Sequence, residues 1–481
     1  PVDTTLPPSR PASATARAVS QFLDDSVLGA ADPYRAGGGR NVTIASVLDK
    51  AAADFETLAS QPALQLRLGL TLVTAYHNLG LEPQARDLGR LALAAAASGG
   101  IATDDADLNS LRDQLAWVEI NLAATGEARA LFQQVLDHSD SADRHRRAAY
   151  GLARVRFEEG YFAESAAGYR ALLDSAAQEG ADAWFLADVR WDLAEAEFEL
   201  HDWAQAAEHL AAVRTLYEQQ LPSSDPRLLW LNVSEAYRLQ MLEQYPAAEA
   251  RLQATLALAT AALGERHPVV MASLHLQGII RNKQGRAREA LPLIEKVVAW
   301  RTQQYGEAHY LTRMSISRLG ESYLQLGQRR EAEALLRRSW TLSIPALGAD
   351  HPHTLDNQRL HAESLLALGR SNEAEQQFRE VLKLGTQRMP ASNNRLAWAR
   401  YGLARVLLAR GERAESQTLL AEAAANFRSN YQAAHSLLPV IEALQESQAL
   451  NEPPQRVSGA RAPSAGAAVL RSPAFDLPAG G

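Results

Sequence analysis

The stretch Leu263-Gly264-Glu265-Arg266-His267-Pro268 decides the fold, because related stretches return twice further along the chain. They are Tyr305-Gly306-Glu307-Ala308-His309 and Leu347-Gly348-Ala349-Asp350-His351-Pro352, and their glycines are spaced by 42 residues. One interval earlier, Leu221-Pro222 and Asp225-Pro226 occupy the corresponding positions. A period between about 20 and 50 residues is the signature of stacked structural repeats. We therefore interpret the chain as an array of repeats.

A second marker follows the same period. Glycines recur every 42 residues, a small residue lies seven positions before each of them, and an alanine lies five positions after the first three. Glycine tolerates the left-handed conformation that ends a helix, and small residues let two helices approach closely. The pattern predicts a pair of helices joined at each glycine. These glycines are Gly285, Gly327, Gly369 and Gly411.

The segment Leu319-Gly320-x-x-Tyr323-x-x-x-Gly327-x-x-x-x-Ala332 resembles the signature of the tetratricopeptide repeat. Its spacing is similar to the longer variant found in kinesin light chains and in many bacterial signalling proteins. This resemblance implies an all-α fold, a right-handed superhelical solenoid of about nine stacked helix-turn-helix repeats.

Some repeats depart from the pattern. The first has Val73 where glycine or alanine is usual, and the stretch 100–138 looks irregular because Gly126 and Ala128 are out of phase. Further on, His201 and Glu243 occupy the position of the turn glycine. We expect the array to continue through all of these positions.

Composition and spacing divide the chain into five expected segments. They are a disordered Pro/Ser-rich linker (1–14), a helical entry segment (15–60) with Thr43 capping a helix over Ile44–Leu58, the solenoid (61–428), a C-terminal capping helix (429–450) and a disordered tail (451–481).

The entry segment carries a second resemblance, on Phe22-Leu23, Ala31-Asp32-Pro33, Gly39-Arg40-x-Val42-Thr43 and Leu48-Asp49-x-Ala51. It resembles the start of the repeat region in bacterial Ser/Thr protein kinases with a transmembrane helix, and in membrane-anchored winged-helix transcriptional regulators. The resemblance implies a membrane span shortly before Pro1, and we expect a mature or excised fragment. The expected location is the cytoplasmic or periplasmic face of a bacterial inner membrane, with the periplasmic face favoured.

The composition limits the classes of function. The chain has 481 residues, a net charge of −8 and no cysteine. This charge argues against nucleic acid as the main partner, since such proteins present a basic face. Without cysteine there is no disulfide and no thiolate metal site. No run reaches the roughly 20 apolar residues of a membrane span.

No motif indicates catalysis or a cofactor. His267, His309 and His351 lie one repeat apart, too far to share a metal, and we expect them to cap helix ends. Gly37-Gly38-Gly39-Arg40 lacks the lysine and hydroxyl of a phosphate loop. We therefore expect a protein that is not an enzyme and holds no metal.

The expected function is binding of a peptide or protein partner in the concave groove of the solenoid, as the sensory or scaffolding region of a bacterial signalling protein. Two alternatives stay open: the regulatory arm of a Ser/Thr protein kinase, and a free-standing assembly scaffold. A homodimer is compatible with each. Register with the family predicts the groove residues Trp230, Tyr237, Gln240, His275, Asn282, Glu321, Arg359, Glu363, Trp398, Tyr401 and Arg405.

Overall fold

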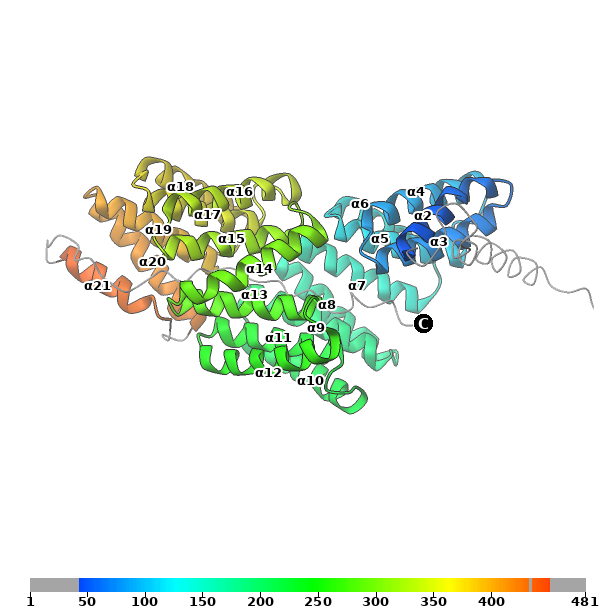
Figure 1. Cartoon of the computed structure of the whole chain (residues 1–481), viewed down its shortest axis with the longest axis horizontal. Coiled ribbons are helices and arrows are strands. Elements are labelled where there is room, and N and C mark those ends of the chain that lie inside the picture. Colours follow the sequence, from blue (N-terminus) through cyan, green and yellow to red (C-terminus); the bar gives the residue numbers. More distant parts are fainter. Residues whose placement is uncertain (1–42, 432–434, 450–481) are drawn as a thin grey trace, which may run out of the picture. The chain divides into compact units, whose positions relative to one another are not determined.

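The computed structural model describes residues 43–431 and 435–449. These residues form twenty α-helices and one short 3-10 helix, with no strand among them (Figure 1). The predicted linker 1–14, the entry motif before residue 43 and the predicted tail 451–481 lie outside the described residues. Within the described part, no helix is long and apolar enough to cross a membrane.

Nine helix pairs follow one another along the chain, and α21 (Leu438–Ala449) comes after the last of them. The helical repeat fold predicted from the 42-residue period is therefore confirmed. The pairs are α3 (Pro62–Asn78) with α4 (Glu82–Ser98), α5 (Ala106–Asn121) with α6 (Thr125–His138), α7 (Ala142–Glu158) with α8 (Phe162–Gln178), α9 (Ala183–Leu200) with α10 (Trp203–Gln220), α11 (Pro226–Met241) with α12 (Tyr245–Leu263), α13 (Pro268–Lys283) with α14 (Ala287–Tyr305), α15 (Tyr310–Gln325) with α16 (Arg329–Leu347), α17 (Pro352–Ala367) with α18 (Ser371–Arg388), and α19 (Asn394–Ala409) with α20 (Arg413–Tyr431).

The entry helix is shorter than predicted. The hydroxyl of Thr43 accepts a hydrogen bond from the Ser46 amide at 3.1 Å, so Thr43 is the N-cap as expected. Helix α2 (Ile44–Ala53) then ends, and the 3-10 helix η3 (Phe55–Leu58) takes the remaining residues.

The described helices fall into two compact units, a division that the sequence did not predict. Unit 1 contains α2 to α7, and unit 2 contains α8 to α21 except residues 174–176, which group with unit 1. In the core of unit 1, Trp117 packs edge-on against Phe132 with 5.4 Å between ring centroids. Gly69 lies so close to Ala92 that an added Cβ would be 2.5 Å from it, so this glycine takes the small-residue role that Val73 lacks.

The turns between paired helices use the left-handed conformation. The four periodic glycines of the sequence have φ between 75° and 82°, and His201 and Glu243 adopt φ values of 66° and 58° in their place, as predicted. The stretch 100–138 was predicted to be irregular, and this prediction is wrong. Ala123, with φ 60°, is its turn residue, and Ala128 follows five positions later, in phase with the other repeats.

The loops between pairs end in a periodic row of N-caps. Nδ1 of His267, His309 and His351 accepts a hydrogen bond from the amide two residues ahead, at 3.3, 3.2 and 3.1 Å. The predicted capping role of the three histidines is confirmed. The row continues with Asn393 and His435, which cap in the same way at 2.9 and 3.2 Å.

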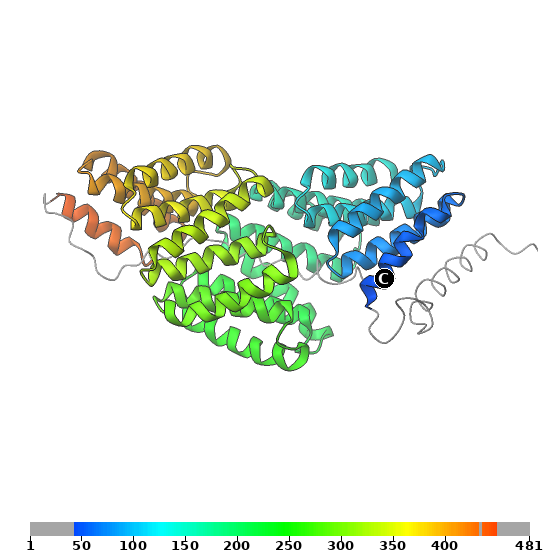
Figure 2. The same ribbon diagram turned by 45° about the horizontal axis from the view of Figure 1, so that its top comes forward.

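The small residues of the repeat do allow close helix crossing. A Cβ added to Gly278 would lie 2.5 Å from Ile294, and one added to Gly320 would lie 2.7 Å from Leu336. These two contacts are one 42-residue period apart, so successive pairs in this part of unit 2 are packed by the same device. Figure 2 shows the paired helices of the stack from a second direction.

Candidate functional site

The first helix of each pair in unit 2 is buried on nearly every side. In α19, every residue from Asn394 to Ala404 is buried, whereas its partner α20 buries residues along one face. In α17 the same pattern recurs. A helix that is buried all round lies in the interior of a protein. The first helices α9, α11, α13, α15, α17 and α19 therefore form the interior of unit 2, which is the candidate site.

This interior is closed by contacts between residues far apart in the sequence. The turn that precedes α8 packs on the start of α17, where a Cβ on Gly160 would lie 2.5 Å from Pro352. Arg388 donates a hydrogen bond to the carbonyl oxygen of Glu159 at 2.8 Å in the same contact.

Two further contacts repeat this arrangement one and two periods later. Glu199, next to the turn at His201, forms an ion pair with Arg395 at 2.8 Å, and both side chains are buried. Glu243, the turn residue before α12, accepts hydrogen bonds from the amide and hydroxyl of Ser436 at 2.9 and 2.8 Å. Each turn thus meets the N-cap region of a helix more than four repeats ahead, which closes the stack of unit 2.

The sequence distinguishes the turns in these contacts from the other turns of unit 2. Aromatic residues follow them: Tyr161 lies under the guanidinium of Arg388 at 4.1 Å, and Trp203 packs near Tyr431 at 6.3 Å. Among the two residues that follow each glycine turn at 285, 327, 369 and 411, none is aromatic. Aromatic side chains provide the contact area with which the other turns pack on a distant helix.

The predicted groove residues lie on these interior helices, but they do not form an open surface. Ten of the eleven predicted residues are buried within unit 2. The remaining one, Arg405, is partly exposed, with 35% of its side chain accessible to solvent. Their binding of a partner stays a prediction. The buried ones are Trp230, Tyr237, Gln240, His275, Asn282, Glu321, Arg359, Glu363, Trp398 and Tyr401.

The structure brings five of them together. Glu363 forms an ion pair with Arg405 at 2.9 Å and lies 4.0 Å from Arg359. The guanidinium of Arg359 is 5.9 Å from the ring centroid of Trp398, and that of Arg405 is 5.4 Å from the centroid of Tyr401. These residues stabilise one another across α17 and α19.

The remaining groove residues serve different local contacts. Trp230 and Tyr237 belong to the apolar core, where Tyr237 packs edge-on against Phe198 at 5.7 Å. Asn282 donates a hydrogen bond to the hydroxyl of Ser322 on the next interior helix, at 2.8 Å.

The predicted groove residues did not include two cations of the interior helices, Arg318 and Lys283. Arg318 pairs with Glu321 at 2.6 Å and approaches Asp356 at 3.8 Å, while Asp356 is also 2.9 Å from Arg359. Register selects only the concave face of a helix, whereas a helix that is buried all round has neighbours on every face. Burial of α15, which carries Arg318, and of α13, which ends at Lys283, was the missing signal.

Lys283 is the least satisfied cation of the interior. Among the described residues its ammonium has no hydrogen bond and no ion pair, and burial lowers the pKa of Lys283 to about 7, against the opposing effect of Glu321. Lys283 is half-buried at the end of α13, and a partly desolvated ammonium without a counter-charge favours an anionic ligand.

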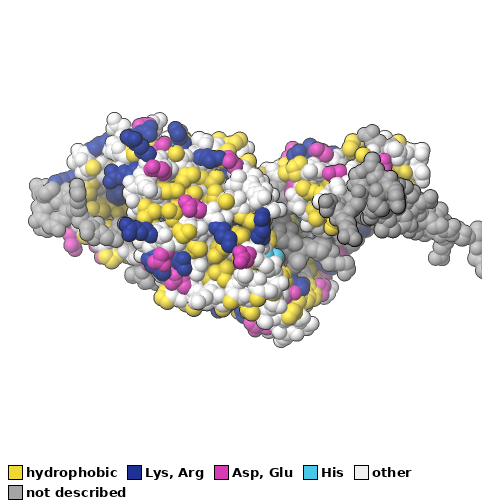
Figure 3. Space-filling model, viewed as in Figure 1, with side chains coloured by type: hydrophobic (Ala, Val, Ile, Leu, Met, Phe, Trp, Pro, Cys, Tyr) yellow, Lys and Arg dark blue, Asp and Glu magenta, His cyan; other side chains and the backbone are white. Residues whose placement is uncertain are grey.

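The surface of unit 2 gives no single charge sign on the face drawn in Figure 3, where basic and acidic side chains alternate around apolar ones. Within the described residues, no group of three His, Cys, Asp or Glu side chains is arranged to hold a metal ion.

Comparison with known proteins identifies the repeats. The tetratricopeptide repeat family model matches residues 227–299, 270–343 and 315–387, which are helices of unit 2. This chain therefore carries tetratricopeptide repeats, as its 42-residue period predicted. The tetratricopeptide repeat fold generally serves as a protein–protein interaction module. None of the curated proteins matches the chain.

Solved structures share the helical repeat. A putative kinesin light chain of Podosopora anserina with nearly identical TPR-like repeats is 25% identical, over 44% of this chain and 100% of that one, with a TM-score of 0.36. A Rap protein in complex with competence and sporulation factor is 13% identical, over 71% of this chain and 99% of that one, with a TM-score of 0.47.

A third is a signal transduction ATPase with numerous domains and a tetratricopeptide repeat sensor, from Pyrococcus horikoshii. It is 15% identical, over 83% of this chain and 54% of that chain, with a TM-score of 0.40. These values assign no residue of this chain to a site.

Proposed function

We propose that this chain is a non-catalytic interaction module that binds a peptide or protein partner in the interior of unit 2. We extend the proposal to a sensory or scaffolding role in a bacterial signalling protein at the inner membrane. The tetratricopeptide repeats support the general role, and the resemblance of the entry segment supports the more specific one.

The observation that carries the proposal is the buried charge of the interior helices. Lysine, arginine, aspartate and glutamate are rarely buried unless they are paired, and burying them costs stability. Arg318, Arg359 and Asp356 are all buried here, and Lys283 has no partner among the described residues. A purely structural interior would be more stable with apolar side chains, so we assign these charges to ligand recognition.

Binding then requires the interior to open. The contact between Glu243 and Ser436 lies at an exposed serine and consists of two hydrogen bonds to a carboxylate, which also lies 3.8 Å from His435; a hydrogen bond to a charged group contributes about 1.5–3 kcal/mol. We propose that a partner separates this contact first, and that the resulting change in the curvature of unit 2 is the signal. A ligand shifts such an equilibrium only through its preference for the open state.

The test uses the absence of cysteine from the sequence. Glu243→Cys and Ser436→Cys are introduced together and joined by a short thiol-reactive cross-linker, and binding to an array of short peptides of varied charge is measured. The control joins Arg379→Cys and Glu415→Cys, an exposed pair at 2.8 Å on neighbouring second helices. We expect the first cross-link alone to abolish peptide binding.

Equal binding by both cross-linked proteins would show that the partner does not enter the interior. If the protein without cross-links bound no peptide on the array, the proposed recognition of peptides would be wrong.

A further inference from the structure

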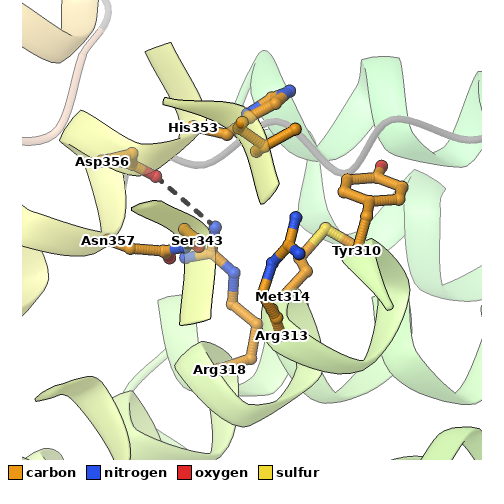
Figure 4. A pocket seen from close by; sticks show the side chains of 9 residues that line it. Tyr310, Arg313, Met314, Arg318, Ser343, His353, Asp356 and Asn357 are labelled. Carbon is orange, nitrogen blue, oxygen red and sulfur yellow. Dashed lines mark hydrogen bonds and ion pairs between the residues drawn. The ribbon is translucent and has the colours of Figure 1, made fainter. Parts of the chain in front are cut away.

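A small pocket lies between α15, α16 and α17 in unit 2 (Figure 4). It has space for about one water molecule or a polar group of that size. Three of its lining residues carry charge: Arg313, Arg318 and Asp356. The other lining residues are Tyr310, Met314, Ser343, Leu347, His353 and Asn357.

Arg313 is the lining residue whose positive charge has no ion-pair partner among the described residues. Its side chain is buried, and its guanidinium donates a hydrogen bond to the carbonyl oxygen of Ala308. No carboxylate among the described residues pairs with it, and burial lowers the pKa of Arg313 to about 10, which leaves it charged at neutral pH. Arginine without a counter-charge in a buried position is rare, because burying an unpaired charge is costly.

The acid in the pocket does not supply that counter-charge. Asp356 is shared by two other cations, with Arg359 at 2.9 Å and Arg318 at 3.8 Å. Figure 4 shows Asp356 joined to Arg318, whose guanidinium lies between Asp356 and Arg313 in this view. His353 adds no negative charge either, and its Nδ1 lies 3.4 Å from a guanidinium nitrogen of Arg395. The lining therefore holds two arginines and one aspartate, and Arg313 is the lining arginine for which the described residues supply no carboxylate.

The equivalent positions in the neighbouring repeats are filled. One period before Ser343 stands Arg301, whose guanidinium donates to the Leu311 carbonyl oxygen at 3.1 Å and to the Ser315 hydroxyl at 2.7 Å. One period after Ser343 stands Gly385, which Leu396 and Met389 cover so closely that an added Cβ would lie 2.6 and 3.1 Å from them. At Ser343 the side chain is small, and the pocket lies at this junction.

We propose that this pocket binds a carboxylate of an acidic ligand, with the guanidinium of Arg313 as its counter-charge. A carboxylate matches the fork of a guanidinium and forms short, charge-assisted hydrogen bonds with it. The hydroxyl of Ser343 and the amide of Asn357, which already bond each other at 3.0 Å, lie in the same lining and can complete the set of polar contacts.

The carboxylate can come from a free small acid or from an acidic peptide, and the second source rests on the proposed function. The probes are sodium acetate and short peptides with a free or an amidated C-terminus. Each is titrated into the full chain by calorimetry, with the ionic strength held constant by sodium chloride. We expect saturable acetate binding, and tighter binding of the peptides with a free carboxylate if a peptide is the source.

Two variants test the site itself. Arg313→Gln removes the charge and should weaken acetate binding by at least about tenfold, the effect of losing one charge-assisted contact. Ser343→Arg installs the side chain that fills the preceding junction and should abolish binding while the protein stays folded. Arg379→Gln, in an exposed ion pair, is the control and should bind acetate as the unaltered protein does.

Acetate binding that is unchanged in Arg313→Gln and Ser343→Arg would overturn the proposal, as would the absence of acetate binding by the unaltered chain. Acetate binding that both variants lose, without any peptide binding, would support the pocket and contradict the proposed recognition of peptides.

Discussion

Arg395 and Glu199 form a buried ion pair, with 2.8 Å between Nη2 and Oε2, although they belong to the last and the first complete helix pairs of unit 2. Only a stack that returns to its own beginning can bring these two residues together. The pair joins α19 to α9, and Arg395 also lies 3.4 Å from His353 of α17. Closure of unit 2 therefore buries charged side chains, which in most proteins lie at the surface in contact with solvent.

The first prediction concerns this pair. Arg395→Met leaves the Glu199 carboxylate buried without its partner, so we expect a loss of about 3–5 kcal/mol in the free energy of unfolding. Arg379→Met removes one partner of the exposed pair with Glu415 and should cost no more than about 1 kcal/mol. Urea denaturation of both variants measures the difference. Equal losses would show that the Arg395 pair is not buried in solution.

The second prediction compares two glycines with the same backbone conformation. Gly160 and Gly327 have φ values of 78° and 81°, so alanine at either should cost about 1 kcal/mol through strain. At Gly160 the new Cβ would also meet Pro352 at 2.5 Å, whereas nothing lies within 4 Å at Gly327. We expect Gly160→Ala to lose about 1–3 kcal/mol more than Gly327→Ala in thermal or urea unfolding. The two variants would unfold alike if this contact were absent.

The third prediction concerns pH. Burial, together with the charge of Lys283, lowers the pKa of His435 to about 3 in the folded protein, against about 6.5 in the unfolded chain. Below pH 6.5 the unfolded chain takes up a proton that the folded chain excludes, so stability is lost as the pH falls, by up to roughly 1.4 kcal/mol per pH unit.

His435→Asn keeps the capping acceptor, as Asn393 does one repeat earlier, but does not titrate. The variant should therefore lose less stability than the unaltered protein between pH 7 and about pH 5. Urea midpoints measured across this range test the expectation, and parallel pH curves for the two proteins would contradict it.

The fourth prediction separates stability from binding at Lys283. Its pKa of about 7 means that the folded interior disfavours the ammonium, so Lys283→Met should raise the free energy of unfolding at pH 7 by about 1 kcal/mol or more. If Lys283 serves a ligand, the same variant should weaken peptide binding. Lys383→Met, at an exposed lysine, should change neither property. A less stable Lys283→Met protein would show that the ammonium is well satisfied in the fold.

Much of the local structure follows directly from the periodic residues. The turn glycines, the replacement of glycine by His201 and Glu243, and the caps at His267, His309 and His351 were all predictable, because each depends on backbone conformation within a few residues. The turn of the repeat at 100–138 was not predictable from glycine spacing, because Ala123 adopts the left-handed conformation and Gly126 lies in the following helix.

The candidate site was predictable only as a set of helices. Register placed Arg359, Glu363 and Arg405 on the right elements, but it could not show that Glu363 lies between the two arginines or that the site is covered. Nor does the sequence mark the pocket at Ser343 until the packing of Arg301 and Gly385 in the neighbouring repeats is known.

The sequence by itself determined the repeat: helix periodicity, turns and caps arise from interactions among neighbouring residues, and they recur whenever the residues recur. Only the tertiary structure decided that unit 2 closes on itself, that Glu199 meets Arg395, and that Arg313 is left beside a pocket. The physical reason is that curvature accumulates from a small rotation between each helix pair and the next. That rotation depends on the packing of many side chains, so contacts across several repeats are set by their sum and by no single motif.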